Sequence, residues 1–218
     1  MKNVFIIIAA YNEAKNISKV LKETKKDYNN IIVIDDGSKD NTFNIAQKEC
    51  VIVLKHIINL GKGAAMKTGC EYAIKKGAEI LVLMDADGQH EPKEISQFLN
   101  KIKEVDIVFG YRKFNKKMPL LLKFGNKCIN IATEKLYGLK LKDTQCGYRT
   151  LKKNSYKKIK WDAIDYSMES EMIANSGKHH LKYAEVPIAT IYSEKYKGTT
   201  PLDGIRIVMN MLLWRLKK

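Results

Sequence analysis

Two aspartates, Asp85 and Asp87, stand two residues apart directly after the apolar run 80–84. Carboxylates with this spacing can both face one divalent cation, because Mg²⁺ and Mn²⁺ prefer oxygen ligands and often share them with substrate phosphates. Gln89 and His90 follow and can complete the set of ligands. A D-x-D pattern alone is common, and the alternative is a pair of solvated loop aspartates. A cation held here would bridge a diphosphate and neutralise charge on a leaving group.

Polar clusters also follow three other apolar runs, at 4–10, 31–34 and 107–109. Aspartate carboxylates after the second run can accept hydrogen bonds from a base N–H or a ribose hydroxyl. The alternative is that they form the turn and cap before the next helix, and one aspartate can do this while the other binds. The three clusters are Tyr11-Asn12-Glu13, Asp35-Asp36-Gly37-Ser38 and Gly110-Tyr111-Arg112.

A glycine-rich segment, 59–63, carries Lys62 just before a helical pattern. Glycines allow close approach of the backbone, and a lysine near a helix N-terminus suits a phosphate. The spacing is not that of a Walker P-loop, and a simple turn explains the segment equally well. Among the arginines we expect Arg112 and Arg149 near phosphate, because the planar guanidinium matches phosphate oxygens.

Apolar runs and helical patterns alternate through the first half of the chain. Strands are predicted at 4–10, 31–34, 51–54, 80–84 and 107–109, and helices from 17 onward and over 40–48, 63–75 and 92–102. This alternation is typical of an α/β fold with a mostly parallel, doubly wound sheet. Ligands bind beyond the carboxyl ends of such strands, so the polar clusters are predicted to converge on one rim of the sheet.

The second half of the chain is less regular. Helices are predicted over 118–137, 167–175 and 202–218, short strands at 183–186 and 189–192, and a polar segment at 143–149. The first and last of these helices are amphipathic with basic edges, which is typical of helices that lie in a membrane interface. The alternative is that their apolar faces pack on the core of the domain.

The formal net charge of +15 indicates an anionic partner: nucleic acid, an anionic membrane surface or a phosphorylated substrate. A lysine-rich composition is the alternative explanation. Nucleic-acid binding is not expected, because clustered basic and aromatic stripes are missing from the sequence. No apolar stretch approaches the about 20 residues that span a bilayer, which predicts peripheral membrane association. The four cysteines lack C-x-x-C spacing and no signal peptide is recognisable, which favours reduced thiols in the cytoplasm.

Taken in order, four motifs resemble those of family-2 glycosyltransferases, which are inverting enzymes of the GT-A fold. They are Ala10-Tyr11-Asn12-Glu13, Asp35-Asp36-Gly37-Ser38, Asn59-Leu60-Gly61-Lys62-Gly63 and Asp85-Ala86-Asp87-Gly88-Gln89-His90. Segment 143–149 resembles the acceptor-side motif of the dolichyl-phosphate mannose synthase branch, and 190–195 resembles the tail motif of its prokaryotic members. Among the departures from the family pattern, Ala10 stands where proline is usual, and 196–201 lacks the common Ser-Lys form.

The resemblance implies a single domain over residues 1–218, with a nucleotide-sugar-binding part at 1–112, an acceptor-binding part at 113–201 and an amphipathic helix at 202–218. It implies a Mg²⁺ or Mn²⁺ cofactor held by Asp85, Asp87 and Gln89. The donor site that it implies comprises Ala10, Tyr11, Glu13, Asp35, Asp36, Lys62, Asp85, Ala86, Asp87 and Lys195. The catalytic residues that it implies are Asp87, Arg112, Gln145 and Arg149, the last three at the acceptor phosphate.

The function implied is transfer of a sugar from a UDP- or GDP-sugar to a polyprenyl or dolichyl phosphate on the cytoplasmic face of a membrane. Such an acceptor needs no general base, since a phosphate oxygen is already anionic at neutral pH. The alternative is an enzyme that glycosylates a sugar hydroxyl, with Asp143, Glu169 or Glu171 as the base. A non-catalytic nucleotide-binding module is a further alternative, which the intact pair of Asp85 and Asp87 argues against.

Overall fold

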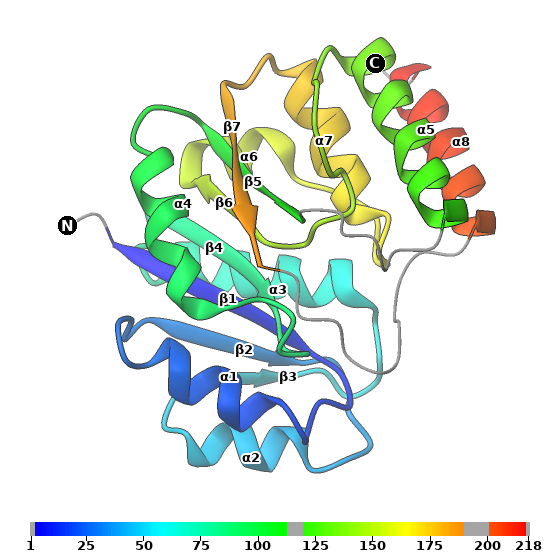
Figure 1. Ribbon diagram of the computed structural model, residues 1–218. Coiled ribbons are helices and arrows are strands. Elements are labelled where there is room, and N and C mark those ends of the chain that lie inside the picture. Colours follow the sequence, from blue (N-terminus) through cyan, green and yellow to red (C-terminus); the bar gives the residue numbers. More distant parts are fainter. Residues whose placement is uncertain (1–2, 113–119, 190–200, 217–218) are drawn as a thin grey trace.

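A computed structural model describes residues 3–112, 120–189 and 201–216, apart from the side chains of 120–126, 128 and 201–205. Seven strands form one sheet in the order β3-β2-β1-β4-β6-β5-β7 (Figure 1). The strands are β1 Val4–Ala10, β2 Ile31–Asp35, β3 Ile52–Lys55, β4 Ile80–Asp85, β5 Ile107–Arg112, β6 Arg149–Lys152 and β7 Tyr183–Ile188. The α/β fold and the mostly parallel sheet predicted from the sequence are confirmed.

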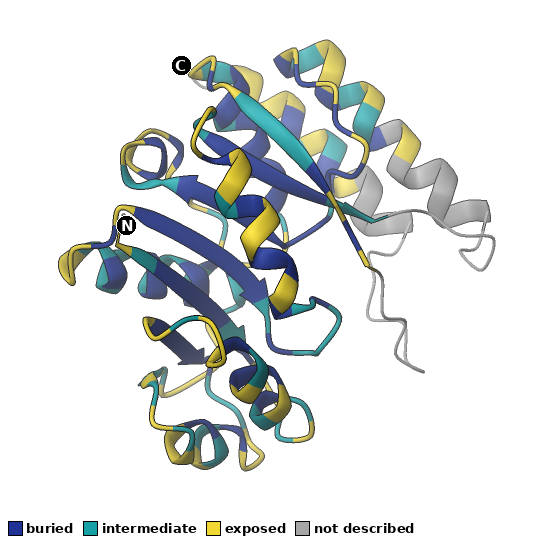
Figure 2. Ribbon diagram, turned by 60° about the vertical axis from the view of Figure 1, so that its left-hand side comes forward, coloured by how far each residue is buried: buried dark blue, intermediate teal, exposed yellow. Residues whose placement is uncertain are grey.

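Helices cover both faces of the sheet (Figure 1). Helices α1 (Ile17–Thr24), α2 (Thr42–Lys48) and α4 (Ile95–Lys101) lie on one face, and α3 (Lys62–Lys75), α6 (Lys153–Ile159) and α7 (Met168–Lys178) lie on the other. The central strands are buried on both sides, as the dark strands of Figure 2 show. This burial explains why β1, β2 and β4 read as unbroken apolar runs and not as alternating patterns.

Strand β6 was not predicted. Its four residues, Arg149-Thr150-Leu151-Lys152, pair antiparallel with both β4 and β5 in the middle of the sheet. So short a segment with a cation at each end carries no recognisable strand period. A short strand was predicted at 183–186, and β7 forms there and adds parallel to β5 at the edge of the sheet. The predicted strand at 189–192 lies outside the described residues from 190 onward.

Two long helices, α5 (Leu120–Tyr137) and α8 (Pro201–Leu216), lie side by side beyond α7 (Figure 1). Both helices were predicted, with ends within two residues of these bounds. Ile129 and Tyr137 of α5 and Ile207 and Met211 of α8 are buried in the same core cluster as α7. Within the described parts of the chain, no helix combines the length and apolarity needed to cross a membrane.

Candidate active site

The carboxyl ends of β1, β2 and β4 meet at one rim of the sheet. In the parallel register Ala10 lies opposite Asp35, and Ala9 lies opposite Asp85. Because β1, β2 and β4 run parallel with this register, the residues that follow each strand lie at the same edge of the sheet. The predicted convergence of these polar clusters is therefore confirmed.

The loops after β1 and β2 are joined by hydrogen bonds through Asn12. Its backbone N–H donates to Ser38 Oγ (2.9 Å), and its side-chain oxygen accepts from the Lys39 N–H (2.8 Å). Asn12 adopts a φ of 55°, a conformation that asparagine tolerates better than most residues. This junction holds Tyr11 on the rim with 40% of its surface exposed. Such an exposed ring can stack on a nucleoside base.

The other predicted residues of this motif are buried. Ala10 is 2% exposed, and its carbonyl oxygen accepts from the Asp36 N–H (2.8 Å). The Glu13 carboxylate accepts from the Asn16 side chain (2.7 Å), while the Glu13 N–H donates to Thr42 Oγ1 (2.8 Å). Both residues thus shape the loops that carry Tyr11.

The two adjacent aspartates after β2 differ in their surroundings. The Asp36 carboxylate accepts from His56 Nδ1 (2.7 Å) and from the backbone N–H groups of Leu60 (3.0 Å) and Gly61 (2.8 Å). It therefore fixes the loop that precedes Lys62. Asp35 is fully buried, and its two carboxylate oxygens have no hydrogen-bond partner within the described structure. The sequence around His56 carries no motif, because its contact with Asp36 spans 20 residues.

Lys62 lies between two carboxylates. Its Nζ is 2.7 Å from Asp85 Oδ1 and 2.8 Å from Glu169 Oε1. Burial by itself lowers the pKa of Lys62, but the two carboxylates outweigh it and raise that pKa above its ordinary value. Burial likewise opposes ionisation of Asp85, and Lys62 reverses the effect and lowers the pKa of that carboxyl group. Both groups are charged at neutral pH.

Asp87 and its neighbours complete this side of the rim. Burial, followed by repulsion from Asp85, raises the pKa of Asp87 to about 6. Its Oδ1 accepts from the Gln89 N–H (2.9 Å), so the contact that Gln89 makes here comes from its backbone. His90 Nδ1 accepts from the Asp85 N–H (3.1 Å), and the ring stacks on Tyr148. Burial lowers the pKa of His90 to about 4, so this ring is neutral.

The donor set fits a hard divalent cation that is shared with a substrate. Two ionisable carboxylates that repel each other, as Asp85 and Asp87 do, are stabilised by a cation between them. Among the described residues no group of three or more His, Cys, Asp or Glu side chains is arranged to hold a metal. Mg²⁺ typically takes its remaining ligands from water and substrate phosphates. The residues present therefore suit a diphosphate-bound cation better than an all-protein cage.

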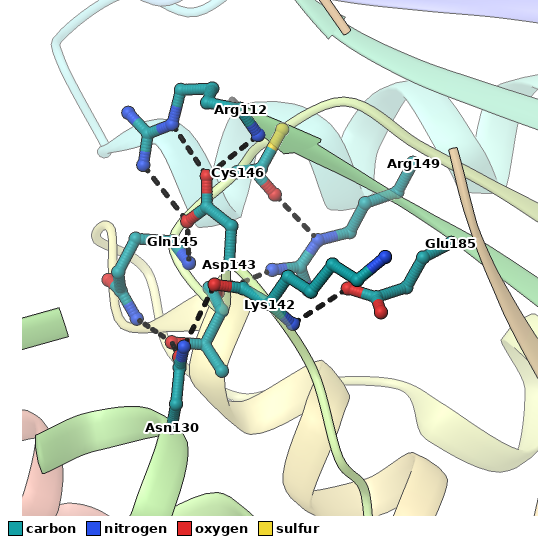
Figure 3. Close-up of polar contacts among 9 residues, drawn as sticks. Arg112, Asn130, Lys142, Asp143, Gln145, Cys146, Arg149 and Glu185 are labelled. Carbon is teal, nitrogen blue, oxygen red and sulfur yellow. Dashed lines mark hydrogen bonds and ion pairs between the residues drawn. The ribbon is translucent and has the colours of Figure 1, made fainter. Parts of the chain in front are cut away.

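The predicted acceptor loop, 143–149, is folded around Asp143 (Figure 3). Arg112 makes a two-pronged ion pair with this carboxylate, with Nε to Oδ2 at 2.6 Å and Nη2 to Oδ1 at 3.0 Å. The Gln145 N–H also donates to Asp143 Oδ1 (3.1 Å), and the Gln145 side chain donates to Ser170 Oγ (3.1 Å) on α7. The structure thus brings Arg112 and Gln145 together through Asp143.

Arg149, which the sequence predicted at the acceptor phosphate, is buried in this structure. It is 1% exposed, and its guanidinium donates to the backbone carbonyl oxygens of Thr144 (3.0 Å), Cys146 (3.0 Å) and Glu169 (2.6 Å). These bonds tie the acceptor loop to α7, and Figure 3 shows the one to the Cys146 carbonyl oxygen. The contact of Arg149 with an acceptor phosphate stays a prediction, and the burial of its side chain favours a positioning role instead.

Two further residues predicted for the donor site are Ala86 and Lys195. Ala86 is buried between the two rim aspartates with 1% of its surface exposed. Lys195 lies outside the described residues. The three carboxylates considered as bases are all engaged: Asp143 by Arg112, Glu169 by Lys62, and Glu171 by the backbone N–H groups of residues 162 and 163.

Comparison with known proteins agrees with this geometry. The model of glycosyl transferase family 2 matches residues 5–160. A UDP-N-acetylglucosamine–dolichyl-phosphate N-acetylglucosaminyltransferase of Methanococcus voltae is 36% identical, with 100% of this chain and 98% of the relative covered. An undecaprenyl-phosphate mannosyltransferase of Micrococcus luteus is 27% identical, with 98% and 94% covered.

Among solved structures, glucosyl-3-phosphoglycerate synthase of Mycobacterium tuberculosis, in a complex with Mn²⁺, UDP and glucosyl-3-phosphoglycerate, has a TM-score of 0.75. The two chains are 17% identical, and the match covers 98% of this chain and 80% of that one, which shows a shared fold. The family match runs from β1 to the residue after α6 and includes the rim formed by the carboxyl ends of β1, β2 and β4. The chain is a glycosyltransferase and belongs to glycosyl transferase family 2.

Proposed function

We propose that this enzyme transfers a sugar from a nucleotide diphosphate donor to a polyprenyl phosphate at a membrane surface. The observation that carries the choice of acceptor is the state of the three carboxylates beside the acceptor loop. Asp143, Glu169 and Glu171 all bind other groups of the protein. A sugar hydroxyl needs a base to remove its proton, whereas a phosphate oxygen is already anionic.

The donor in this proposal lies across the rim formed by β1, β2 and β4. Tyr11 would contact the nucleoside, and Asp85 and Asp87 would hold a divalent cation. That cation would neutralise the charge that develops on the leaving diphosphate. The relative from Methanococcus voltae makes UDP-N-acetylglucosamine the first donor to test, because its similarity extends over nearly the full length of both chains.

The chain's own residues have separate tasks in the reaction. Arg112 and Gln145 hold the acceptor loop in place through Asp143, next to the rim that binds the donor. Since both substrates are negatively charged, the principal work is to position them and to compensate their charge. Of the two arginines predicted near phosphate, Arg112 is the more accessible to an anionic acceptor, because 24% of its side chain is exposed and Arg149 is buried.

Contact with the membrane is assigned in the same proposal to α5 and α8. One face of α8 is buried against α5 and α7, and a second face is exposed and apolar. The exposed residues, Met209, Leu212, Leu213 and Leu216, recur at helical spacing. Basic side chains at the edges of these helices, such as exposed Lys127 and Arg206, suit anionic lipid headgroups. The membrane in this proposal is faced from the cytoplasm.

The proposal is tested with purified protein, Mn²⁺ or Mg²⁺, a short polyprenyl phosphate and labelled UDP- and GDP-sugars. Label is counted in the organic phase after extraction. We expect metal-dependent transfer of one sugar to the lipid, with UDP-N-acetylglucosamine as donor. Nucleotide release that depends on an added sugar acceptor, with no lipid label, would establish the alternative, an enzyme acting on a sugar hydroxyl.

A further inference from the structure

The ion pairs of Lys62 join the two halves of the active site. Asp85 belongs to the end of β4 on the donor side, and Glu169 belongs to the first turn of α7 beside the acceptor loop. Lys62 Nζ contacts both, at 2.7 Å and 2.8 Å, with 13% of its side chain exposed. The position of Lys62 thus depends on Asp85, which lies 23 positions later in the chain, and on Glu169, which lies 107 positions later.

The ammonium group of Lys62 already contacts one carboxylate oxygen of Asp85, which is a proposed metal ligand. At 2.7 Å it lies directly on Asp85 Oδ1, so a divalent cation at that oxygen would meet a like charge at short range. The surroundings leave little room for both cations. A Cβ atom on Gly147 would lie 2.7 Å from Lys62 Nζ and 3.0 Å from Asp85 Oδ2, which shows how closely the acceptor loop packs against this pair.

We propose that Lys62 is an internal counter-ion that neutralises Asp85 before the donor binds and moves to the donor diphosphate when the metal arrives. This inference rests on the proposed function, because it needs a cation at Asp85. Exchange of one cation for another keeps the buried carboxylate compensated in both states, which avoids the cost of an unpaired buried charge.

Two features favour this exchange over loss of Lys62 from the site. Glu169 is 4% exposed and its Oε2 has no hydrogen-bond partner among the described residues, so this carboxylate continues to attract the ammonium group. Lys62 is also the first residue of α3, and the next two backbone N–H groups, of Gly63 and Ala64, donate to the Ile164 carbonyl oxygen (2.7 and 3.2 Å). The backbone beside Lys62 is therefore held in place, and only its side chain has to turn from Asp85 to the diphosphate.

The test measures Mn²⁺ binding by electron paramagnetic resonance, first without nucleotide. Because Lys62 and Mn²⁺ compete for Asp85, we expect Lys62→Met to bind free Mn²⁺ more tightly, by about 5- to 150-fold. The same variant should bind UDP more weakly in saturating Mn²⁺. Opposite changes for metal and nucleotide distinguish exchange from general damage to the site. Lys75→Met removes an exposed charge from the other end of α3 and should change neither affinity.

Charge and folding are separated by two further variants. Lys62→Arg keeps the positive charge and should retain weak binding of free Mn²⁺, and Lys62→Gln replaces the methionine variant if circular dichroism shows that the latter is unfolded. Unchanged or weaker binding of free Mn²⁺ after loss of the charge would overturn the exchange.

Asp85→Asn tests the metal site itself. If this variant binds Mn²⁺ with UDP as well as the wild type does, the proposed metal ligand is wrong, and the inference fails with it.

Discussion

Asp87 is the residue on which the proposed metal chemistry most directly depends. Its carboxylate is anchored on one side by the Gln89 N–H and lies close enough to Asp85 for their charges to repel. A second carboxylate near a first one costs stability unless a cation compensates it, and this is typical of functional sites. Among the polar residues of the rim, it is the one that we expect to tolerate substitution structurally but not catalytically.

Asp87→Asn removes the charge and keeps the shape of the side chain. We expect kcat/KM for sugar transfer to fall at least about 100-fold, which corresponds to loss of about 3 kcal/mol of transition-state stabilisation. The melting temperature should stay the same or rise, because the repulsion from Asp85 is relieved. The exposed loop residue Asp27 supplies the control, since Asp27→Asn changes the net charge equally and should leave activity unchanged. Full activity of Asp87→Asn would remove this residue from the metal site.

For Arg149 we expect substitution to lower stability, in contrast to Asp87, where it should lower activity. Replacement of its guanidinium by the methionine side chain leaves the carbonyl groups of Thr144, Cys146 and Glu169 without their donor. Each buried unsatisfied polar group costs about 1–3 kcal/mol, so Arg149→Met should lower the free energy of unfolding by at least about 3 kcal/mol. Urea unfolding followed by circular dichroism measures this change.

Kinetics decide between this role and the one that the sequence predicted for Arg149. If Arg149 contacted the acceptor phosphate directly, its replacement by methionine would raise the acceptor KM and leave stability unchanged. Arg149→Lys should also destabilise the protein, because an ammonium group cannot serve three carbonyl oxygens in the geometry of the planar fork. A stable Arg149→Met protein with an impaired acceptor KM would restore the original interpretation.

At the scale of elements, α5 and α8 combine two roles that the sequence presented as alternatives. One side of the pair packs on the core through Ile129, Tyr137, Ile207 and Met211. The other side exposes apolar residues, with Leu213 at 55% and Leu216 at 80%. A helix with one apolar face on the core and further apolar residues exposed between basic edges is typical of helices that lie on a lipid surface, which fits the acceptor that we propose.

Leu213→Ser combined with Leu216→Ser tests this surface. Burial of one leucine contributes about 1.5–3 kcal/mol, so loss of both should weaken vesicle partitioning at least about tenfold. Co-sedimentation with vesicles measures the partitioning. Turnover of a water-soluble short-chain acceptor should stay unchanged, because both leucine side chains are exposed on the surface of α8. Ile52→Ser, at 36% exposure on the outermost strand β3, is the matched control and should bind vesicles normally. Equal partitioning of the double variant and the wild type would argue against α8 as the membrane contact.

Elements also show where sequence patterns are informative. Strands β1, β2 and β4 were predicted because a strand buried on both faces is a continuous apolar run, which depends only on neighbouring residues. Strand β6 was missed because its place in the sheet comes from pairing with β4 and β5, which lie tens of residues away. The same long-range pairing explains why Arg149 is buried although it ends a polar segment.

For the whole molecule, the formal charge of +15 is large for 218 residues. Long-range attraction to an anionic membrane is screened by salt, whereas insertion of apolar side chains is not. The two contributions to the proposed membrane binding are therefore separable. Charge brings the protein to the surface, and the exposed leucines of α8 hold it there.

Vesicle binding at two salt concentrations tests this division. Raising the ionic strength from about 0.1 M to about 1 M shortens the Debye length from about 10 Å to about 3 Å. We expect binding to vesicles that contain anionic lipid to weaken markedly, and binding to neutral vesicles to remain weak and nearly independent of salt. Salt-independent binding to anionic vesicles would instead show that the charge excess serves another purpose.

The sequence by itself determined the fold class, the family and the rim that carries Tyr11, Asp35, Asp85 and Asp87, because each of these depends on short motifs and on the apolar run before them. Tertiary structure decided which charges face one another. The pairing of Lys62 with Asp85 and Glu169, and the burial of Arg149, join segments far apart in the chain. Such contacts arise only when the sheet and α7 have assembled, since no local pattern encodes a partner about 100 residues away.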